Sequence, residues 1–89
     1  MSVEDTFRAE SGRAVAALIR IFGDVDVAED AVQDAFAAAL VEWPRDGVPE
    51  SAYAWIVRVG RNRASDRLRR ESLGRSIVGD LAESADEPE

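Results

Sequence analysis

The sequence predicts an all-α fold, a compact bundle of three main helices. Apolar side chains recur at helical i+3/i+4 spacing from residue 4 to residue 73, and two breaks containing glycine or proline divide this stretch into three. No segment shows the alternation typical of a β-strand. Because 89 residues form one small domain at most, we expect a helical domain over residues 1–75 and a disordered acidic tail over residues 76–89.

The first predicted helix covers residues 4–22. Its apolar residues recur at helical spacing from Phe7 to Phe22. Gly23 follows directly, at the position where a left-handed glycine ends many helices. We therefore expect the first turn of the chain at Gly23.

The second predicted helix opens at Asp26. Glu29 stands three residues later, which is the spacing of a capping box with Asp26 as the N-cap. Apolar residues then recur on one face as far as Trp43. Pro44 is expected to end this helix, and residues 44–51, with two prolines and one glycine, are expected to form a loop.

The third predicted helix covers residues 52–72, with Gly74 as its terminator. With about 100° of rotation per residue, one side of this helix is apolar. A second arc, about 100° wide, is polar and contains no acidic residue. The polar arc consists of Arg58, Arg61, Asn62, Ser65 and Arg69. Arginine suits phosphate contacts and an asparagine amide suits base edges. The neighbouring Tyr53 and Trp55 offer rings for stacking unpaired bases, although Trp55 taken alone fits the core as well.

The charge distribution favours a polyanion-binding surface on this helix. Residues 58–75 hold seven arginines and two acids, a net charge of +5, whereas residues 1–57 carry −7 and residues 76–89 carry −5. An isolated basic block in an acidic chain indicates one surface that attracts polyanions and others that repel them. Arginines near a helix C-terminus also suit the helix dipole, and an arginine-bearing face is often simply solvated. This structural explanation fits Arg67, Arg69 and Arg70, but not the more central Arg58 and Arg61.

The second predicted helix carries acidic and amide side chains opposite its apolar face. These residues are Asp26, Asp30, Gln33 and Asp34. The face is either an ordinary solvated surface or a docking surface for a basic partner helix. Paired-carboxylate catalysis and metal binding are weaker interpretations, because so small a helical domain rarely encloses a pocket and the spacing of an EF-hand loop is missing.

Composition excludes several classes of function. The chain has no cysteine and no histidine, which rules out disulfides, Cys/His zinc sites and histidine-based acid–base chemistry. Without a phosphate-cradling glycine loop either, we expect no enzymatic activity and no cofactor. The N-terminus is charged and no apolar run approaches about 18 residues, so we expect a cytoplasmic protein that does not enter a membrane.

Two stretches resemble signature helices of region 2 of bacterial RNA polymerase sigma factors, in the extracytoplasmic-function (ECF) class of the sigma-70 family. Residues 26–36, followed by Trp43, resemble its D-x-x-E-D-x-x-Q-x-x-F helix, and residues 53–70 resemble its W-I/L-x-x-x-A/G-R-N-x-x-x-D-x-L-R-R helix. Both occur in order, and the resemblance covers residues 5–72. The opening residues 4–13 also resemble the subgroup whose full-length members carry a long C-terminal extension.

The resemblance implies a partner for each polar face. The acidic residues of the second helix would contact the clamp coiled coil of the polymerase β′ subunit. Asn62 matches the family's base-contacting asparagine, and residues 44–51 would close over a base flipped from the −10 promoter element. The phosphates and sugars of the melted non-template strand would be held by Arg58, Arg61, Ser65 and Arg69.

The resemblance thus implies a transcription initiation domain whose partners are core RNA polymerase and −10 promoter DNA, with an anti-sigma factor or a C-terminal extension as further candidates. Region 4, which reads the −35 element in this family, has no counterpart here, so we expect an isolated domain or a piece of a longer protein. One alternative is a helical protein-interaction module that does not bind DNA. Another is a helix-turn-helix reader of duplex DNA, for which residues 44–51 form a long connection.

Overall fold

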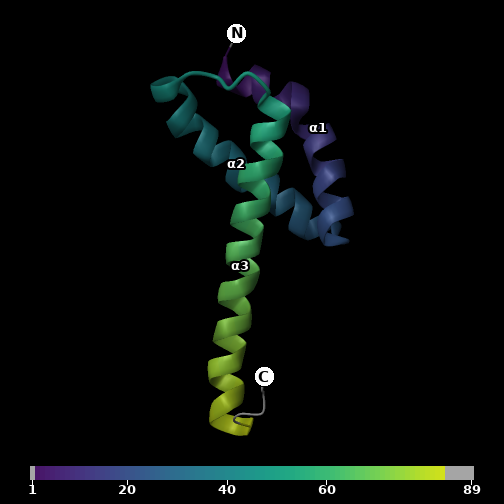
Figure 1. Ribbon diagram of the computed structural model, residues 1–89, viewed down its shortest axis with the longest axis vertical. Coiled ribbons are helices and arrows are strands. Elements are labelled where there is room, and N and C mark those ends of the chain that lie inside the picture. The colour runs from purple at the N-terminus through teal and green to yellow at the C-terminus, as the bar shows by residue number, and fades with distance from the viewer. Residues whose placement is uncertain (1, 84–89) are drawn as a thin grey trace.

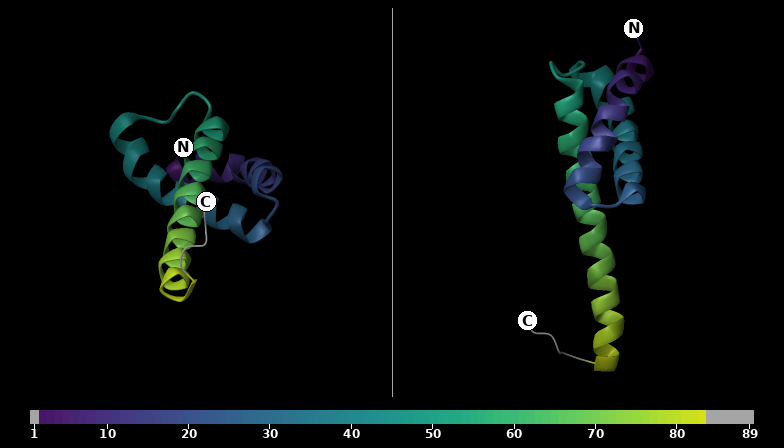
Figure 2. Two further views of the ribbon diagram at one scale, coloured as in Figure 1. Left: turned by 60° about the horizontal axis from the view of Figure 1, so that its bottom comes forward. Right: turned by 90° about the vertical axis from the view of Figure 1, so that its right-hand side faces the viewer.

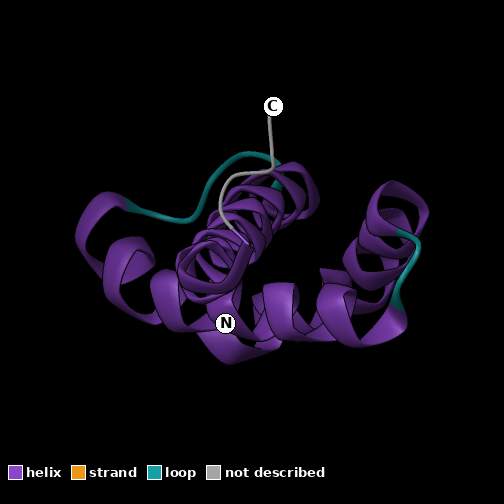
Figure 3. Ribbon diagram, turned by 90° about the horizontal axis from the view of Figure 1, so that it is seen from below, coloured by secondary structure: helices purple, strands orange, loops and turns teal. Residues whose placement is uncertain are grey.

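The computed structural model describes residues 2–83, and it describes side-chain surroundings as far as Ser72. It contains three helices: α1 (Val3–Phe22), α2 (Val25–Asp46) and α3 (Ala52–Glu83). The all-α prediction is confirmed. α1 and α2 pack against the N-terminal half of α3, which extends well beyond them (Figure 1, and from other sides Figure 2). Helices and two short connections make up the whole described chain (Figure 3).

Both ends of α1 are capped by local hydrogen bonds. At the N-terminus the Ser2 hydroxyl accepts a hydrogen bond from the Asp5 N–H at 3.1 Å, which satisfies one of the donors that a helix start leaves open. At the C-terminus Gly23 adopts φ 69°, and its N–H donates to the Ile19 carbonyl at 2.6 Å. The predicted cap glycine is therefore confirmed.

α2 begins two residues earlier than the sequence pattern predicts. Asp24 is the N-cap: its backbone is extended and its Oδ1 accepts from the Val27 N–H at 3.0 Å. The prediction of Asp26 as the cap is wrong, because Gly23 turns the chain so tightly that Val25 is already helical. Asp26 instead lies in the first turn, where a carboxylate favours the helix dipole.

α2 also ends later than predicted. Pro44 lies inside the last turn, and the helix continues to Asp46 before Gly47, at φ 96°, ends it with a hydrogen bond to the Trp43 carbonyl. Pro44 lacks the N–H that would donate to the Leu40 carbonyl, but its fixed φ is compatible with a helix, and the helix continues for two residues beyond it. The connecting loop is therefore 47–51, and the prediction of a loop from Pro44 onwards is wrong for its first three residues.

α3 continues through Gly74 to Glu83, so its predicted end at Ser72 is wrong. A glycine costs a helix about 1 kcal/mol, but it ends one only when the backbone turns left-handed, and in the described chain Gly23 and Gly47 alone have positive φ. The first part of the predicted acidic tail, residues 76–83, is accordingly helical. The rest of that tail, residues 84–89, lies outside the described residues.

The core between the helices is built mainly from small side chains. Leu18 and Ile56 are its largest fully buried residues, and most of the others are alanines of α1, α2 and α3. At Gly60 the helices approach one another closely: a Cβ there would lie 3.1 Å from Leu18 Cδ1 and 3.3 Å from the Ala31 carbonyl oxygen. Contact with both α1 and α2 at one residue fixes α3 against the other two helices.

Aromatic rings close the end of the bundle at which α3 begins. The Phe7 ring lies 5.0 Å from Phe36 and 6.0 Å from Trp43, and Trp43 meets Trp55 edge-on at 5.1 Å between centroids. These tilted and T-shaped arrangements are the ones that aromatic quadrupoles favour. The cluster joins the first two turns of α1 and the first turn of α3 to the second half of α2. No helix in the described part of the chain is both long and apolar enough to span a membrane.

Candidate nucleic-acid and protein interface

The structure exposes the polar arc predicted on α3. All five of its residues are exposed: Arg58, Arg61, Asn62, Ser65 and Arg69. Between residues 52 and 72, where the structure describes side chains, the buried residues of this helix are Ile56, Gly60 and Ala64, which lie on the opposite side. Leu68, which helical spacing puts at the edge of the apolar arc, is 39% exposed.

The cations of this arc differ in their local partners. Arg69 donates to Asp66 of the same helix at 2.6 Å. Among the side chains that the structure describes, neither Arg58 nor Arg61 pairs with a carboxylate. These two guanidinium groups therefore keep all their donors available for an external anion such as phosphate.

The two rings predicted to stack bases both have partners within the protein. Trp55 is half-buried and forms the T-shaped contact with Trp43, so it helps to close the core. Tyr53 is also half-buried, and the guanidinium carbon of Arg13 lies 4.3 Å from its ring centroid. Arg13 is a residue of α1 that the sequence analysis missed, because no pattern within α3 reveals what covers one face of Tyr53.

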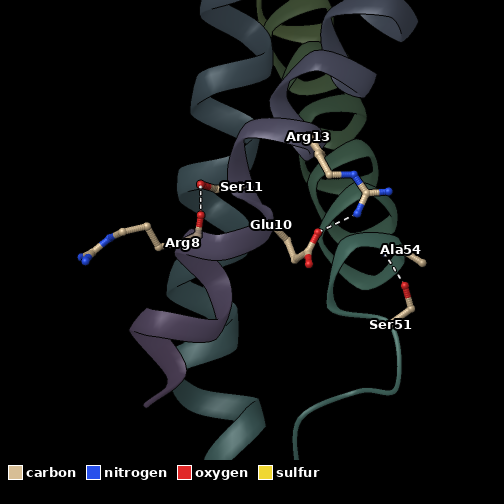
Figure 4. Close-up of polar contacts among 6 residues, drawn as sticks. All are labelled: Arg8, Glu10, Ser11, Arg13, Ser51 and Ala54. Carbon is tan, nitrogen blue, oxygen red and sulfur yellow. Dashed lines mark hydrogen bonds and ion pairs between the residues drawn. The ribbon is translucent and has the colours of Figure 1, made fainter. Parts of the chain in front are cut away.

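Arg13 and the start of α3 each have a local polar contact (Figure 4). Its Nη1 donates to Glu10 at 2.8 Å, one turn back on α1. At the end of the 47–51 loop, the Ser51 hydroxyl accepts from the Ala54 N–H at 3.2 Å, which caps α3. The first turn of α3, the loop before it and Arg13 thus lie together at one corner of the bundle.

The acidic face predicted on α2 is only partly open. Asp26, Asp30 and Gln33 are exposed, whereas Asp34 is half-buried. Arg67 of α3 explains the difference: its Nη2 donates to Asp34, and its Nη1 lies 3.6 Å from Asp30 Oδ2. The explanation of Arg67 as a solvated last-turn cation is therefore wrong. Helical spacing places Arg67 on the same side of α3 as the buried Ile56, but it does not indicate which side chains of α2 Arg67 meets there.

A shallow groove of about 220 Å³ lies between α1 and α2, beside this face. Phe7, Val32 and Phe36 form its apolar floor, and Gln33 is one of its polar walls. Gln33 therefore borders both the groove and the acidic face. Within the described side chains, no group of three or more acidic residues is arranged to hold a metal ion.

The fold and its surfaces define a small helical module with an arginine-rich face on one helix and an acidic face on another. Comparison with known proteins agrees: the family model for sigma-70 region 2 matches residues 6–74. The chain belongs to the sigma-70 region 2 family.

One relative in the comparison is an uncharacterised protein of Rhizobium meliloti (strain 1021). The chain is 47% identical to it over 60 residues, which are 67% of this chain and 14% of the relative. The chain therefore spans only a small part of that protein's length. No solved structure matches the chain significantly.

Proposed function

We propose that the chain is a transcription initiation module that docks on the β′ clamp helices of RNA polymerase and melts the −10 promoter element by binding its non-template strand. The observation that carries the proposal is the exposure of an acid-free arginine and asparagine face on α3, together with membership of the sigma-70 region 2 family. The acidic residues on α2 give the module a second, chemically opposite surface.

On the DNA side, each exposed residue type has a distinct task. Arg58 and Arg61 contact phosphates of the single strand, and the Asn62 amide donates to and accepts from a base edge. The 47–51 loop precedes α3 directly and closes over a flipped base. Flipping costs a few kcal/mol, which base capture and phosphate neutralisation offset.

Three further residues have smaller parts in this proposal. Ser65 and Arg69 extend the face by one turn, although Arg69 must exchange Asp66 for a phosphate. Stacking of bases on Tyr53 and Trp55 stays a prediction. Because Arg13 and Trp43 already contact these rings, a base would use the remaining exposed ring surface.

Titration of the 89-residue chain with labelled oligonucleotides tests the DNA side. The probe is a pool of single strands randomised over the −10 segment, so that no particular promoter sequence is assumed. The same pool as duplex serves for comparison. Three or four phosphate contacts predict that log K falls against log salt with a slope of about −2 to −3 for single strands. Arg61→Glu should abolish binding, while Arg20→Glu, an exposed change on α1, should weaken it only slightly.

A preference for duplex would favour a helix-turn-helix reader instead. Absence of binding to both pools, with polymerase binding intact, would favour the protein-interaction module. Retention of binding by Arg61→Glu would show that the α3 face is not the DNA-binding surface.

Capture of core RNA polymerase, and of an isolated β′ clamp-helix fragment, tests the docking side. Asp30→Arg reverses an exposed charge on the acidic face and should abolish capture, and Gln33→Ala should weaken it. Arg61→Glu should leave capture unchanged, because Arg61 lies on the other surface. Capture that survives Asp30→Arg would contradict docking through α2.

A further inference from the structure

We infer that Arg67 is an internal competitor for the acidic docking face of α2. The inference rests on the proposed function, since it concerns how that face meets a basic partner. It assigns a regulatory role to a residue that lies on neither of the two predicted contact surfaces.

The geometry places one cation between two of the four face residues. Arg67 extends from α3 so that its two terminal nitrogens reach Asp34 and Asp30, which are four residues and so about one turn apart on α2. The side chains of Arg67 and Asp34 are 34% and 33% exposed, whereas Asp30 is 61% exposed. The guanidinium therefore holds Asp34 closely and Asp30 loosely, at the margin of solvent.

This arrangement changes the charge that an incoming partner meets. Asp26, Asp30 and Asp34 carry three negative charges, and Arg67 neutralises one of them at short range. A lysine or arginine of the partner helix must either leave Asp34 to Arg67 or displace Arg67 from it. In both cases docking is weaker than the same acidic residues would support alone, because Coulombic attraction between partly exposed charges depends on the net charge nearby.

The identity and exposure of the bridged residues distinguish competition from simple stabilisation of the bundle. A pair buried away from the face would only stabilise α3 against α2. Here the bridged residues are the proposed contact residues themselves, and their side chains are 33% (Asp34) and 61% (Asp30) exposed. The partner's cations and Arg67 therefore contend for the same carboxylate oxygens.

The test compares Arg67→Met with the unaltered chain for binding to the β′ clamp-helix fragment, by fluorescence anisotropy at low and high salt. Methionine keeps an apolar stem and removes the cation. An exposed ion pair contributes about 0.2–1 kcal/mol, so Arg67→Met should bind about 1.4- to fivefold more tightly at low salt, with the gain shrinking at high salt.

Arg20→Met is the matched control. It removes one exposed arginine from the last turn of α1, and within the described side chains Arg20 forms no ion pair with α2. It changes the net charge equally but should leave the affinity nearly unaltered. In an Asp34→Asn background, Arg67→Met should gain much less, because the main contested carboxylate is gone.

The outcomes separate the inference from the proposed function. Docking of the unaltered chain with equal or weaker binding by Arg67→Met overturns the competition and leaves docking intact. An equal gain from Arg20→Met also overturns it, as a general charge effect. If neither form binds, docking through α2 fails and the inference fails with it. Circular dichroism checks the fold, and Arg67→Gln replaces Arg67→Met if the latter does not fold.

Discussion

The guanidinium carbon of Arg13 on α1 lies 4.3 Å from the ring centroid of Tyr53 at the start of α3. The same guanidinium pairs with Glu10 at 2.8 Å, which directs it toward the ring. A cation over an aromatic face at this distance is attracted by the ring's quadrupole. The contact ties α1 to the turn of α3 that follows the 47–51 loop, and so helps to position the proposed base-binding corner.

The Arg13–Tyr53 contact predicts a measurable coupling. Arg13→Gln should lower the free energy of unfolding by about 0.5–1 kcal/mol, the usual range for an exposed cation–π pair. In a Tyr53→Leu background the same change should cost clearly less. Loss of the Glu10 ion pair is common to both backgrounds and cancels in the double-mutant cycle, measured by urea denaturation. Equal costs in the two backgrounds would show that the contact contributes nothing.

The close packing of α1 and α2 around Gly60 predicts that a side chain at this position destabilises the fold. Gly60→Val should destabilise the fold by about 1–3 kcal/mol, the range for overpacking a core, because a Cβ would already lie 3.3 Å from the Ala31 carbonyl oxygen. Gly12→Ala is the control within a helix: nothing lies within 4 Å of a Cβ at that position, and it should stabilise by about 0.5–1 kcal/mol through helix propensity. Thermal unfolding of both variants checks the pair. A stable Gly60→Val variant would contradict the observed packing.

The N-cap of α2 gives a test between Asp24 and Asp26. Asp24 accepts a hydrogen bond from the Val27 N–H, so Asp24→Ala should cost about 1 kcal/mol of stability, as is typical for loss of a cap. Asp26 lies in the first turn and interacts only with the helix dipole, so Asp26→Ala should cost a few tenths of a kcal/mol. Urea denaturation of the two variants shows which substitution lowers the free energy of unfolding more. A larger cost at Asp26 would restore the capping box that the sequence pattern suggests.

The Arg45–Asp46 pair at the end of α2 predicts a shifted titration. Two hydrogen bonds of 3.0 Å from Arg45 hold the pKa of the Asp46 carboxyl below its ordinary value, against a smaller opposing effect of burial. The same hydrogen bonds raise the pKa of Arg45. Because the carboxyl pKa is lower in the folded state, its contribution to stability is present above the unfolded pKa and disappears as the pH falls through the folded pKa.

NMR titration of the Asp46 carboxyl carbon measures this shift directly. In an Arg45→Gln variant the midpoint should move up toward the ordinary aspartate value. An unchanged Asp46 midpoint would mean that the pair does not persist in solution.

The helical periodicity was enough to predict which elements form and which face of each is polar. The three helices, the cap at Gly23 and the exposure of the arc from Arg58 to Arg69 all follow from local spacing. Element ends were harder to predict. Asp24 and Asp26 are both good caps by composition, and Pro44 and Gly74 both break helices on average, so local preference could not decide between neighbouring positions.

The sequence by itself determined the fold class and the separation of acidic and basic residues, because helical spacing and charge are properties of near neighbours in the chain. Only the tertiary structure decided what lies between those helices. Arg13 covers Tyr53, and Arg67 reaches Asp30 and Asp34, across gaps of roughly 30 to 40 positions in the chain. Such contacts depend on the angle and depth at which α3 meets α1 and α2, which the close packing at Gly60 sets and no local pattern encodes.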